Sequence, residues 1–109
     1  MAKIEHESPI EGIVRDEYKR QLQLKSLFEK EIESYPKGTL SFQKRRGKLY
    51  VYRKYRDGDK TVNIYIGSEH SEEVSAIQDQ IKKRQELEKM LKEVKKNIKR
   101  MDKVFHAAN

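Results

Sequence analysis

Apolar residues recur at helical spacing in the first third of the chain. Val14, Tyr18 and Leu22 follow one another in steps of four, and Leu24, Phe28 and Ile32 repeat the step on a neighbouring stripe. This period places apolar side chains on one side of a helix, so it predicts an amphipathic helix over residues 8–35.

The ends of this helix are marked by local signals. The sequence SPIE at residues 8–11 combines an N-cap serine, a proline at the first helical position and a capping-box glutamate. Gly12 weakens the first turn, which favours a start of regular helix nearer Val14. Pro36 predicts the end, because the residue before a proline is disfavoured in the helical conformation.

Residues 39–67 change to a period of two. Three runs alternate apolar and polar residues, namely TLSFQKR, KLYVYRKYR and TVNIYIG. Gly47 separates the first two runs, and Asp57-Gly58, a strong hairpin signal, separates the second and third. The pattern predicts a three-stranded antiparallel β-meander.

The last third of the chain returns to helical spacing and predicts a long helix over residues 71–106. Ser71 is a suitable N-cap, and the two glutamates that follow it favour the positive end of the helix dipole. From residue 87 onward the apolar steps are 4, 3, 4, 3 and 4, which is a coiled-coil-like seam. The candidate oligomerisation residues of this seam are Leu87, Leu91, Val94, Ile98, Met101 and Phe105.

The C-terminal helix is too long for three short strands to cover. At ~1.5 Å per residue it spans about 50 Å. We therefore expect the seam to pack on the first helix, on a second copy of the chain in a homodimer, or on another protein.

Together these elements predict an α+β fold in the order α-β-β-β-α. A chain of 109 residues predicts a single domain, 1–109, and 35% hydrophobic against 39% charged residues predicts a thin core.

Without cysteine there is neither a disulfide framework nor a thiolate metal site. This composition fits a cytoplasmic protein. We expect neither a secretory signal nor a membrane segment, because no apolar run is long enough.

The net charge of +7 is concentrated in the middle of the chain. Residues 37–67 hold nine Lys/Arg and two Asp/Glu, a net of +7, whereas residues 1–36 have a net of −2 and residues 68–109 a net of +2. A basic patch of this kind attracts phosphate polyanions or acidic protein surfaces.

Strand alternation divides the tyrosines of this basic segment into two sets. If Leu49 and Val51 face the core, Tyr50 and Tyr52 face the other way together with Tyr65. The core face would also hold Leu40, Phe42, Tyr55, Val62, Ile64 and Ile66. Rings beside Arg and Lys can stack bases and hold phosphates. The candidate nucleic-acid-binding residues are Lys44, Arg45, Arg46, Lys48, Tyr50, Tyr52, Lys54, Arg56 and Tyr65.

The same tyrosines also have a purely structural interpretation. Tyrosine favours strands, and Tyr50 and Tyr52 could pack under a helix with their hydroxyls in water. A register slip of one residue would exchange the two faces, so the sequence leaves the choice open.

No pattern in the sequence indicates catalysis. The histidines are His6, His70 and His106, and no two of them have metal-ligand spacing. The serines lack a nucleophile-elbow context, and no phosphate-binding loop occurs. We therefore expect no enzyme, no catalytic residue, no metal and no cofactor.

The segment YPKGTLSFQKRRGKLYVYRKYRDGDKTVNIYIG resembles a pattern in small bacterial, archaeal and phage proteins. These have a helix that ends in a Pro-Lys-Gly turn, a tyrosine-rich meander that ends in Tyr-Ile-Gly, and a charged helix. The matching residues here are Pro36, Lys37, Gly38, Leu40, Gly47, Tyr50, Tyr52, Tyr55, Arg56, Gly58, Lys60, Tyr65, Ile66 and Gly67. The resemblance implies no activity. The meander is also loosely similar to the three-stranded DNA-reading sheets of some phage and transposon integrases.

Two functions are compatible with these features. The first is a small basic accessory protein that binds DNA or RNA through the tyrosine-rich sheet face and the basic turn. The alternative is a phage- or mobile-element-encoded protein, of the anti-CRISPR type, that binds a host nucleoprotein defence complex stoichiometrically and inhibits it.

Overall fold

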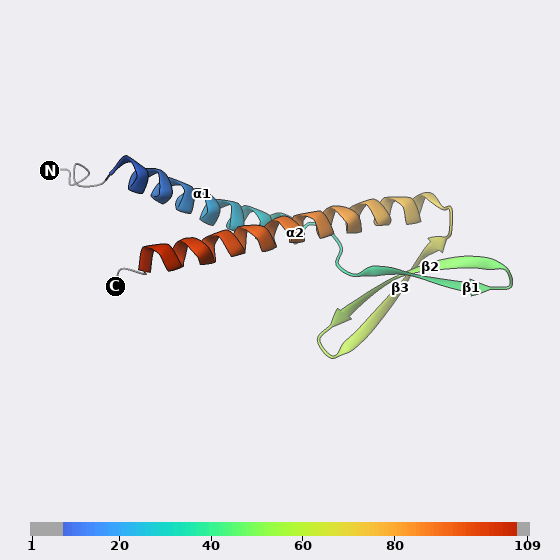
Figure 1. Cartoon of the computed structure of the whole chain (residues 1–109). Coiled ribbons are helices and arrows are strands. Elements are labelled where there is room, and N and C mark those ends of the chain that lie inside the picture. Colours follow the sequence, from blue (N-terminus) through green and yellow to red (C-terminus); the bar gives the residue numbers. More distant parts are fainter. Residues whose placement is uncertain (1–7, 107–109) are drawn as a thin grey trace. The chain divides into compact units, whose positions relative to one another are not determined.

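A computed structural model describes residues 8–106 of the chain. The elements, in order, are α1 (Pro9–Ile32), β1 (Thr39–Arg45), β2 (Lys48–Asp57), β3 (Lys60–Ser68) and α2 (Glu72–His106) (Figure 1). This is the predicted α+β fold with the order α-β-β-β-α. The sheet and α2 lie within a residue or two of their predicted bounds, but α1 ends at Ile32, whereas the prediction ran to residue 35.

The chain divides into two compact units. The helical unit combines the chain up to Glu31 with the chain from Glu88 onward, and the sheet unit comprises Ile32–Leu87. The helix α2 thus contributes its first half to the sheet unit and its second half to the helical unit. Each unit is described on its own, and a single domain stays a prediction.

The start of α1 follows the capping box. The Glu11 backbone N–H donates to Ser8 Oγ at 3.1 Å, and the Ser8 backbone N–H donates to Glu11 Oε2 at 3.4 Å. These two bonds satisfy donors that the first turn leaves open. The helix therefore begins at Pro9, and the expected delay to Val14 caused by Gly12 is wrong.

In the helical unit, α1 packs antiparallel against the second half of α2. Tyr18 Oη donates to Asp102 Oδ1 at 2.5 Å, and its ring stacks on Phe105 at 5.2 Å. One turn along α1, the buried Gln21 accepts from Asn97 Nδ2 at 3.3 Å. The bond to Asp102 and partial desolvation raise the pKa of Tyr18. These polar contacts fix which turns of the two helices face each other.

The apolar seam of α2 is partly covered within a single chain. Leu87 and Val94 are 2% and 6% exposed, whereas Leu91, Ile98 and Met101 are half-buried and Phe105 is 37% exposed. Intramolecular packing, one of the three expected partners, thus already uses the two most buried residues. A homodimer through this seam stays a prediction.

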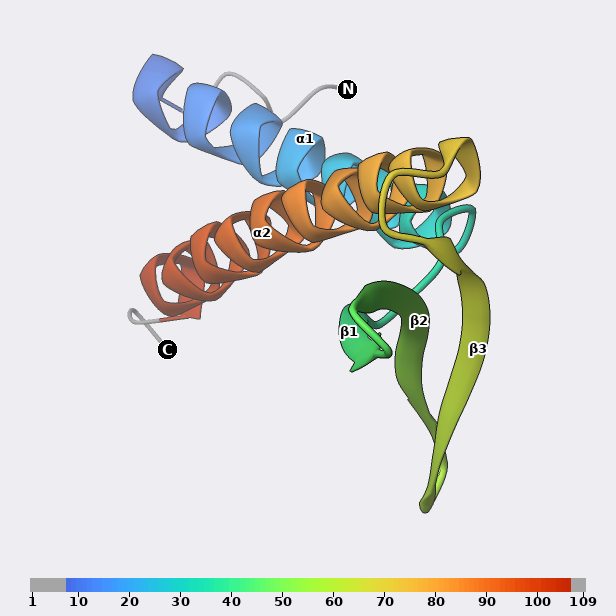
Figure 2. The same ribbon diagram turned by 90° about the vertical axis from the view of Figure 1, so that its right-hand side faces the viewer.

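In the sheet unit, the three strands form an antiparallel meander of order β1-β2-β3, strongly twisted in Figure 2. Val51, in the central strand, is fully buried, and Val74 and Ile81 on the first half of α2 are buried. Leu40, Phe42 and Ile81 border one hollow, which places this part of α2 over the Val51 face of the sheet.

Two expected core residues of this face are exposed. Phe42 and Ile64 are 52% and 39% exposed, although both lie on the same face as Val51 by register. A helix is ~10 Å wide, whereas a sheet of three strands is about 14 Å wide. The length of the strands exceeds this width. One helix therefore covers Val51 and leaves the flanks of the face open.

The Pro-Lys-Gly turn that precedes β1 is held against β2. Gly38 has φ of 110°, and a Cβ there would overlap the Lys54 carbonyl oxygen. Arg53 Nη1 donates to the Lys37 carbonyl oxygen at 2.7 Å, and its guanidinium lies 4.4 Å from the centre of the Tyr55 ring. Arg53 and Tyr55, which lie on the Val51 face, thus anchor the turn.

Arg84 of α2 closes the carboxyl end of α1. Its Nη1 donates to the carbonyl oxygens of Ile32 at 2.9 Å and Tyr35 at 2.6 Å. Carbonyl groups in the last helical turn have no partner within the helix, so a cation at this position stabilises the end. This contact, together with the turn before Pro36, accounts for the end of α1 at Ile32.

We predict that Gly38→Ala destabilises the protein more than Gly47→Ala. Both glycines have positive φ, a conformation that costs an L-residue about 1–2 kcal/mol. Only Gly38 also faces backbone within contact distance, whereas a Cβ on Gly47 meets nothing within 4 Å. Urea denaturation of both variants checks this, and equal losses of stability would contradict the close packing at Gly38.

A second prediction concerns acid pH and α1. Hydrogen bonds from Arg20 and Gln21 hold the pKa of Glu17 at about 2, below its ordinary 4.5. The bonds therefore stabilise the folded chain above pH 4.5, and this contribution is lost as the pH falls toward 2.

Arg20→Ala should move the pKa of Glu17 up toward 4.5 in an NMR titration of the carboxyl carbon. Lys19→Ala, which removes a neighbouring cation, should leave it unchanged, and equal shifts in both variants would refute a specific Arg20 contact.

Candidate nucleic-acid interface

The face of the sheet opposite Val51 carries three tyrosines. Alternation along β2 places Tyr50 and Tyr52 on this face, and the register pairs Tyr52 with Tyr65 of β3. Tyr65 is 53% exposed and the other two rings are half-buried. The structure thus brings together the three tyrosines that strand alternation had grouped.

A β-bulge adjusts the position of Tyr65. The register shifts between Val51 and Tyr52, so that Val51 pairs with Gly67 and leaves Ile66 as the extra residue of β3. A bulge bends and twists its strand locally. The Tyr65 ring lies 5.4 Å from the Tyr52 ring, edge to face, and 6.3 Å from the Tyr50 ring. Tyr65 therefore contacts both tyrosines of β2.

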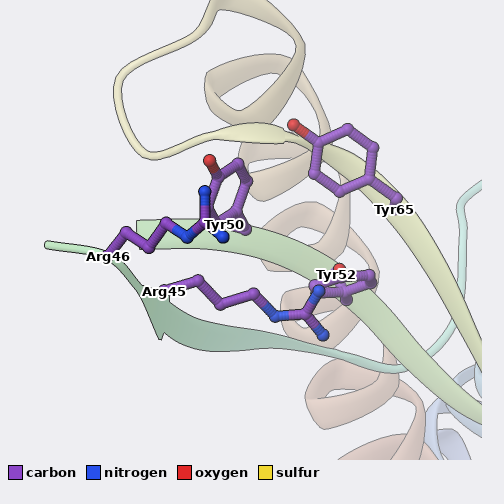
Figure 3. Close-up of a pocket in the computed structure, with 5 residues that line it drawn as sticks. All are labelled: Arg45, Arg46, Tyr50, Tyr52 and Tyr65. Atoms are coloured by element: carbon purple, nitrogen blue, oxygen red, sulfur yellow. The ribbon is translucent and has the colours of Figure 1, made fainter. Parts of the chain in front are cut away.

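Two arginines from the β1–β2 turn reach the same face. Arg45 is the last residue of β1, and its Nη2 donates to Gln43 Oε1 at 3.3 Å. Arg46 and Gly47 form the two-residue connection, with φ of 51° and 79°. These angles are typical of a type I′ turn, whose twist matches that of the flanking strands. In Figure 3 both arginine side chains extend from this turn toward the tyrosines.

The five side chains line one open hollow of about 520 Å³, formed by Arg45, Arg46, Tyr50, Tyr52 and Tyr65 (Figure 3). None of the lining residues is acidic, so the two guanidinium groups give the hollow a positive potential. Aromatic faces and cationic donors therefore converge on one space that is open to solvent.

The other four candidate residues lie outside the hollow. Lys44 pairs with Leu49 and falls by alternation on the Val51 face. Lys48, Lys54 and Arg56 fall on the tyrosine face, at its two ends, and are exposed. These three extend the basic surface on either side of the hollow, whereas Lys44 belongs to the opposite side of the sheet.

A second, apolar hollow, which the sequence pattern does not indicate, lies in the helical unit. It has a volume of about 410 Å³ and is lined by Arg15, Tyr18, Lys19, Leu22 and Phe105. The helical spacing places Tyr18, Leu22 and Phe105 on packing stripes. Their contribution to an open hollow depends on where two helices diverge, and helical periodicity carries no signal for that.

The described part of the chain offers no metal centre and no membrane span. Between residues 8 and 106 no three His, Cys, Asp or Glu side chains lie close enough together to hold a metal ion. No helix in the same range has a stretch long and apolar enough to cross a bilayer. That the protein is not an enzyme stays a prediction.

Comparison with protein families matches residues 11–76 to a domain of unknown function, DUF6788. The match spans more than half of the 109 residues. The chain belongs to the DUF6788 family. The DUF6788 match includes most of α1, the whole sheet and the start of α2, so every residue of the tyrosine–arginine hollow lies within it. Neither the curated proteins nor the solved structures contain a match to the chain.

The left-handed backbone conformation of Arg46 leads to a prediction about the stability of this DUF6788 chain. A non-glycine residue in the left-handed region is strained, and Asn tolerates that region better than Arg does. We expect Arg46→Asn to stabilise the fold by about 0.5–1 kcal/mol, measured by thermal unfolding. Arg45→Asn, one residue earlier and within β1, is the matched control and should not stabilise, since Asn is unfavourable in strands. A loss of stability in Arg46→Asn would contradict the strain.

Proposed function

We propose that this protein is a small nucleic-acid-binding accessory protein. It binds through the hollow of Arg45, Arg46, Tyr50, Tyr52 and Tyr65 and the basic surface around it. The observation that supports this most directly is the convergence of three tyrosine rings and two guanidinium groups on one solvent-open hollow. Proteins bind nucleic acids with this combination of cationic and aromatic groups.

The charge distribution supports the same function. The segment 37–67, which includes the whole sheet, holds nine basic and two acidic residues. Contacts to phosphates release condensed counterions, and such binding is long-ranged and independent of sequence. The sheet unit thus provides the electrostatic attraction, and the hollow provides a defined place of contact.

Each group in the hollow has a distinct role in this proposal. Guanidinium groups donate paired hydrogen bonds to phosphate oxygens, so Arg45 and Arg46 hold the backbone of the nucleic acid. The tyrosine rings contact bases or sugars. Lys48, Lys54 and Arg56 supply further phosphate contacts on either side of the hollow.

The proposal predicts a change in salt dependence for Arg45→Ala. Loss of one phosphate contact should weaken binding and reduce the slope of log K against log salt concentration by about 1. The measurement is a titration with labelled DNA and RNA at several salt concentrations. Arg100→Ala removes the same charge from an exposed position on α2 and is the control.

The control is informative in both directions. The proposal expects Arg100→Ala to retain the slope of the unchanged protein. Equal losses in the two variants would indicate binding by net charge alone, and a failure of all DNA and RNA to bind at low salt would refute the proposed function.

The alternative function, stoichiometric inhibition of a nucleoprotein defence complex, is favoured by one observation. The hollow of Tyr18, Leu22 and Phe105 in the helical unit is apolar and open, as protein-binding surfaces often are. This function requires a defined protein partner whose complex survives nuclease treatment and is weakened by Phe105→Ala but not by Arg45→Ala.

A further inference from the structure

We infer that the tyrosine–arginine hollow selects single-stranded nucleic acid and takes an unstacked base against the open face of a tyrosine ring. This inference rests on the proposed function and adds the class of substrate to it. It follows from three properties of the hollow, which are its ring surfaces, its concave shape and its lack of amide and carboxylate side chains.

The faces of the tyrosine rings can stack only on a base that has left the stack of a duplex. Tyr65 is 53% exposed and meets Tyr52 edge to face, so part of its ring stays open toward the solvent. In a double helix the flat face of each base is covered by the next base pair. A base can stack on a tyrosine only when it has left that stack, as in single strands, loops and frayed ends.

The concave shape differs from the projecting elements that usually read a duplex. A protein reads the major groove with an element that projects into it, because the groove is ~12 Å wide and ~8.5 Å deep. Here the rings and guanidinium groups surround a hollow of about 520 Å³. Volumes of this order, within ~300–1,000 Å³, accommodate small ligands such as a single nucleotide.

The chemistry of the lining predicts weak dependence on base sequence. Hydrogen-bonding to base edges is mainly the work of amide and carboxylate side chains and bidentate arginines. The lining contains no Asn, Gln, Asp or Glu side chain, and its two arginines bind phosphate in the proposed function. Gln43 and Asn63 each lie two residues away from a lining residue, and Gln43 accepts a bond from Arg45. Stacking tolerates every base, so pyrimidine homopolymers suffice as probes.

The test compares two aromatic residues of equal exposure on opposite faces of the sheet. Tyr65 is 53% exposed within the hollow, and Phe42 is 52% exposed on the Val51 face. The full-length protein and the variants Tyr65→Ala, Tyr65→Phe and Phe42→Ala are titrated with labelled oligonucleotides of about 12 residues. The probes are oligo(dT), oligo(rU) and a blunt DNA duplex of equal length at one low salt concentration.

The expected result has three parts. Oligo(dT), oligo(rU) or both bind more tightly than the duplex, and the ratio of the two single-stranded affinities distinguishes DNA from RNA as the preferred ligand. Tyr65→Ala weakens single-strand binding by about fivefold or more, the loss typical of one stacked base. Tyr65→Phe, which retains the ring, restores most of the affinity lost in Tyr65→Ala. Phe42→Ala, which leaves the hollow intact, binds as the unchanged protein does.

Failure of the inference differs from failure of the proposed function. Equal binding of duplex and single strands, or indifference to Tyr65→Ala, overturns the single-strand inference even when Arg45→Ala still weakens binding. Equal weakening by Tyr65→Ala and Phe42→Ala also overturns it, because the loss then follows the integrity of the sheet. Absence of binding to all three probes overturns the proposed function as well.

Discussion

Burial of Val51 on one face of β2 is the constraint on which the rest of the sheet unit depends. Side chains on a strand alternate between faces, so the complete burial of Val51 under α2 commits Tyr50 and Tyr52 to the opposite face. Arg53 and Tyr55 reinforce this choice, since both contact the turn before β1. A slip of one residue would bury a tyrosine in place of Val51 and release the turn.

The same constraint gives the two faces of the sheet different roles. The Val51 face packs on α2, and residues near Gly38 close one end of it. The opposite face carries the three tyrosines, and there the bulge at Ile66 and the left-handed Arg46 shape a hollow. Bulges and strained turn residues often occur where a sheet presents side chains to a ligand. The positive charge of residues 37–67 is therefore combined with a hollow of defined shape.

The sequence contained enough information for the order of elements and for the grouping of tyrosines. Period-two alternation and the turn signals at Gly47 and Asp57-Gly58 depend on neighbouring residues only, so they can be read without tertiary structure.

The exposure of Phe42, the bulge at Ile66 and the bonds from Arg84 to the end of α1 could not be predicted. The exposure of Phe42 depends on how much of the face a helix covers, the bulge on the pairing of β2 with β3, and the bonds from Arg84 on a partner some fifty residues away. The seam on α2 had several possible partners by spacing alone, and the burial of Leu87 and Val94 within one chain is decided by packing.

The central claim is that the tyrosine–arginine hollow is the surface that contacts nucleic acid. The most direct measurement is an NMR titration of the isotopically labelled protein with a short single-stranded oligonucleotide, which follows backbone amides and tyrosine rings together. The account predicts that the shift changes are concentrated at residues 45–52 and at Tyr65. Changes concentrated instead on the basic residues in the second half of α2, with the tyrosine rings unaffected, would contradict it.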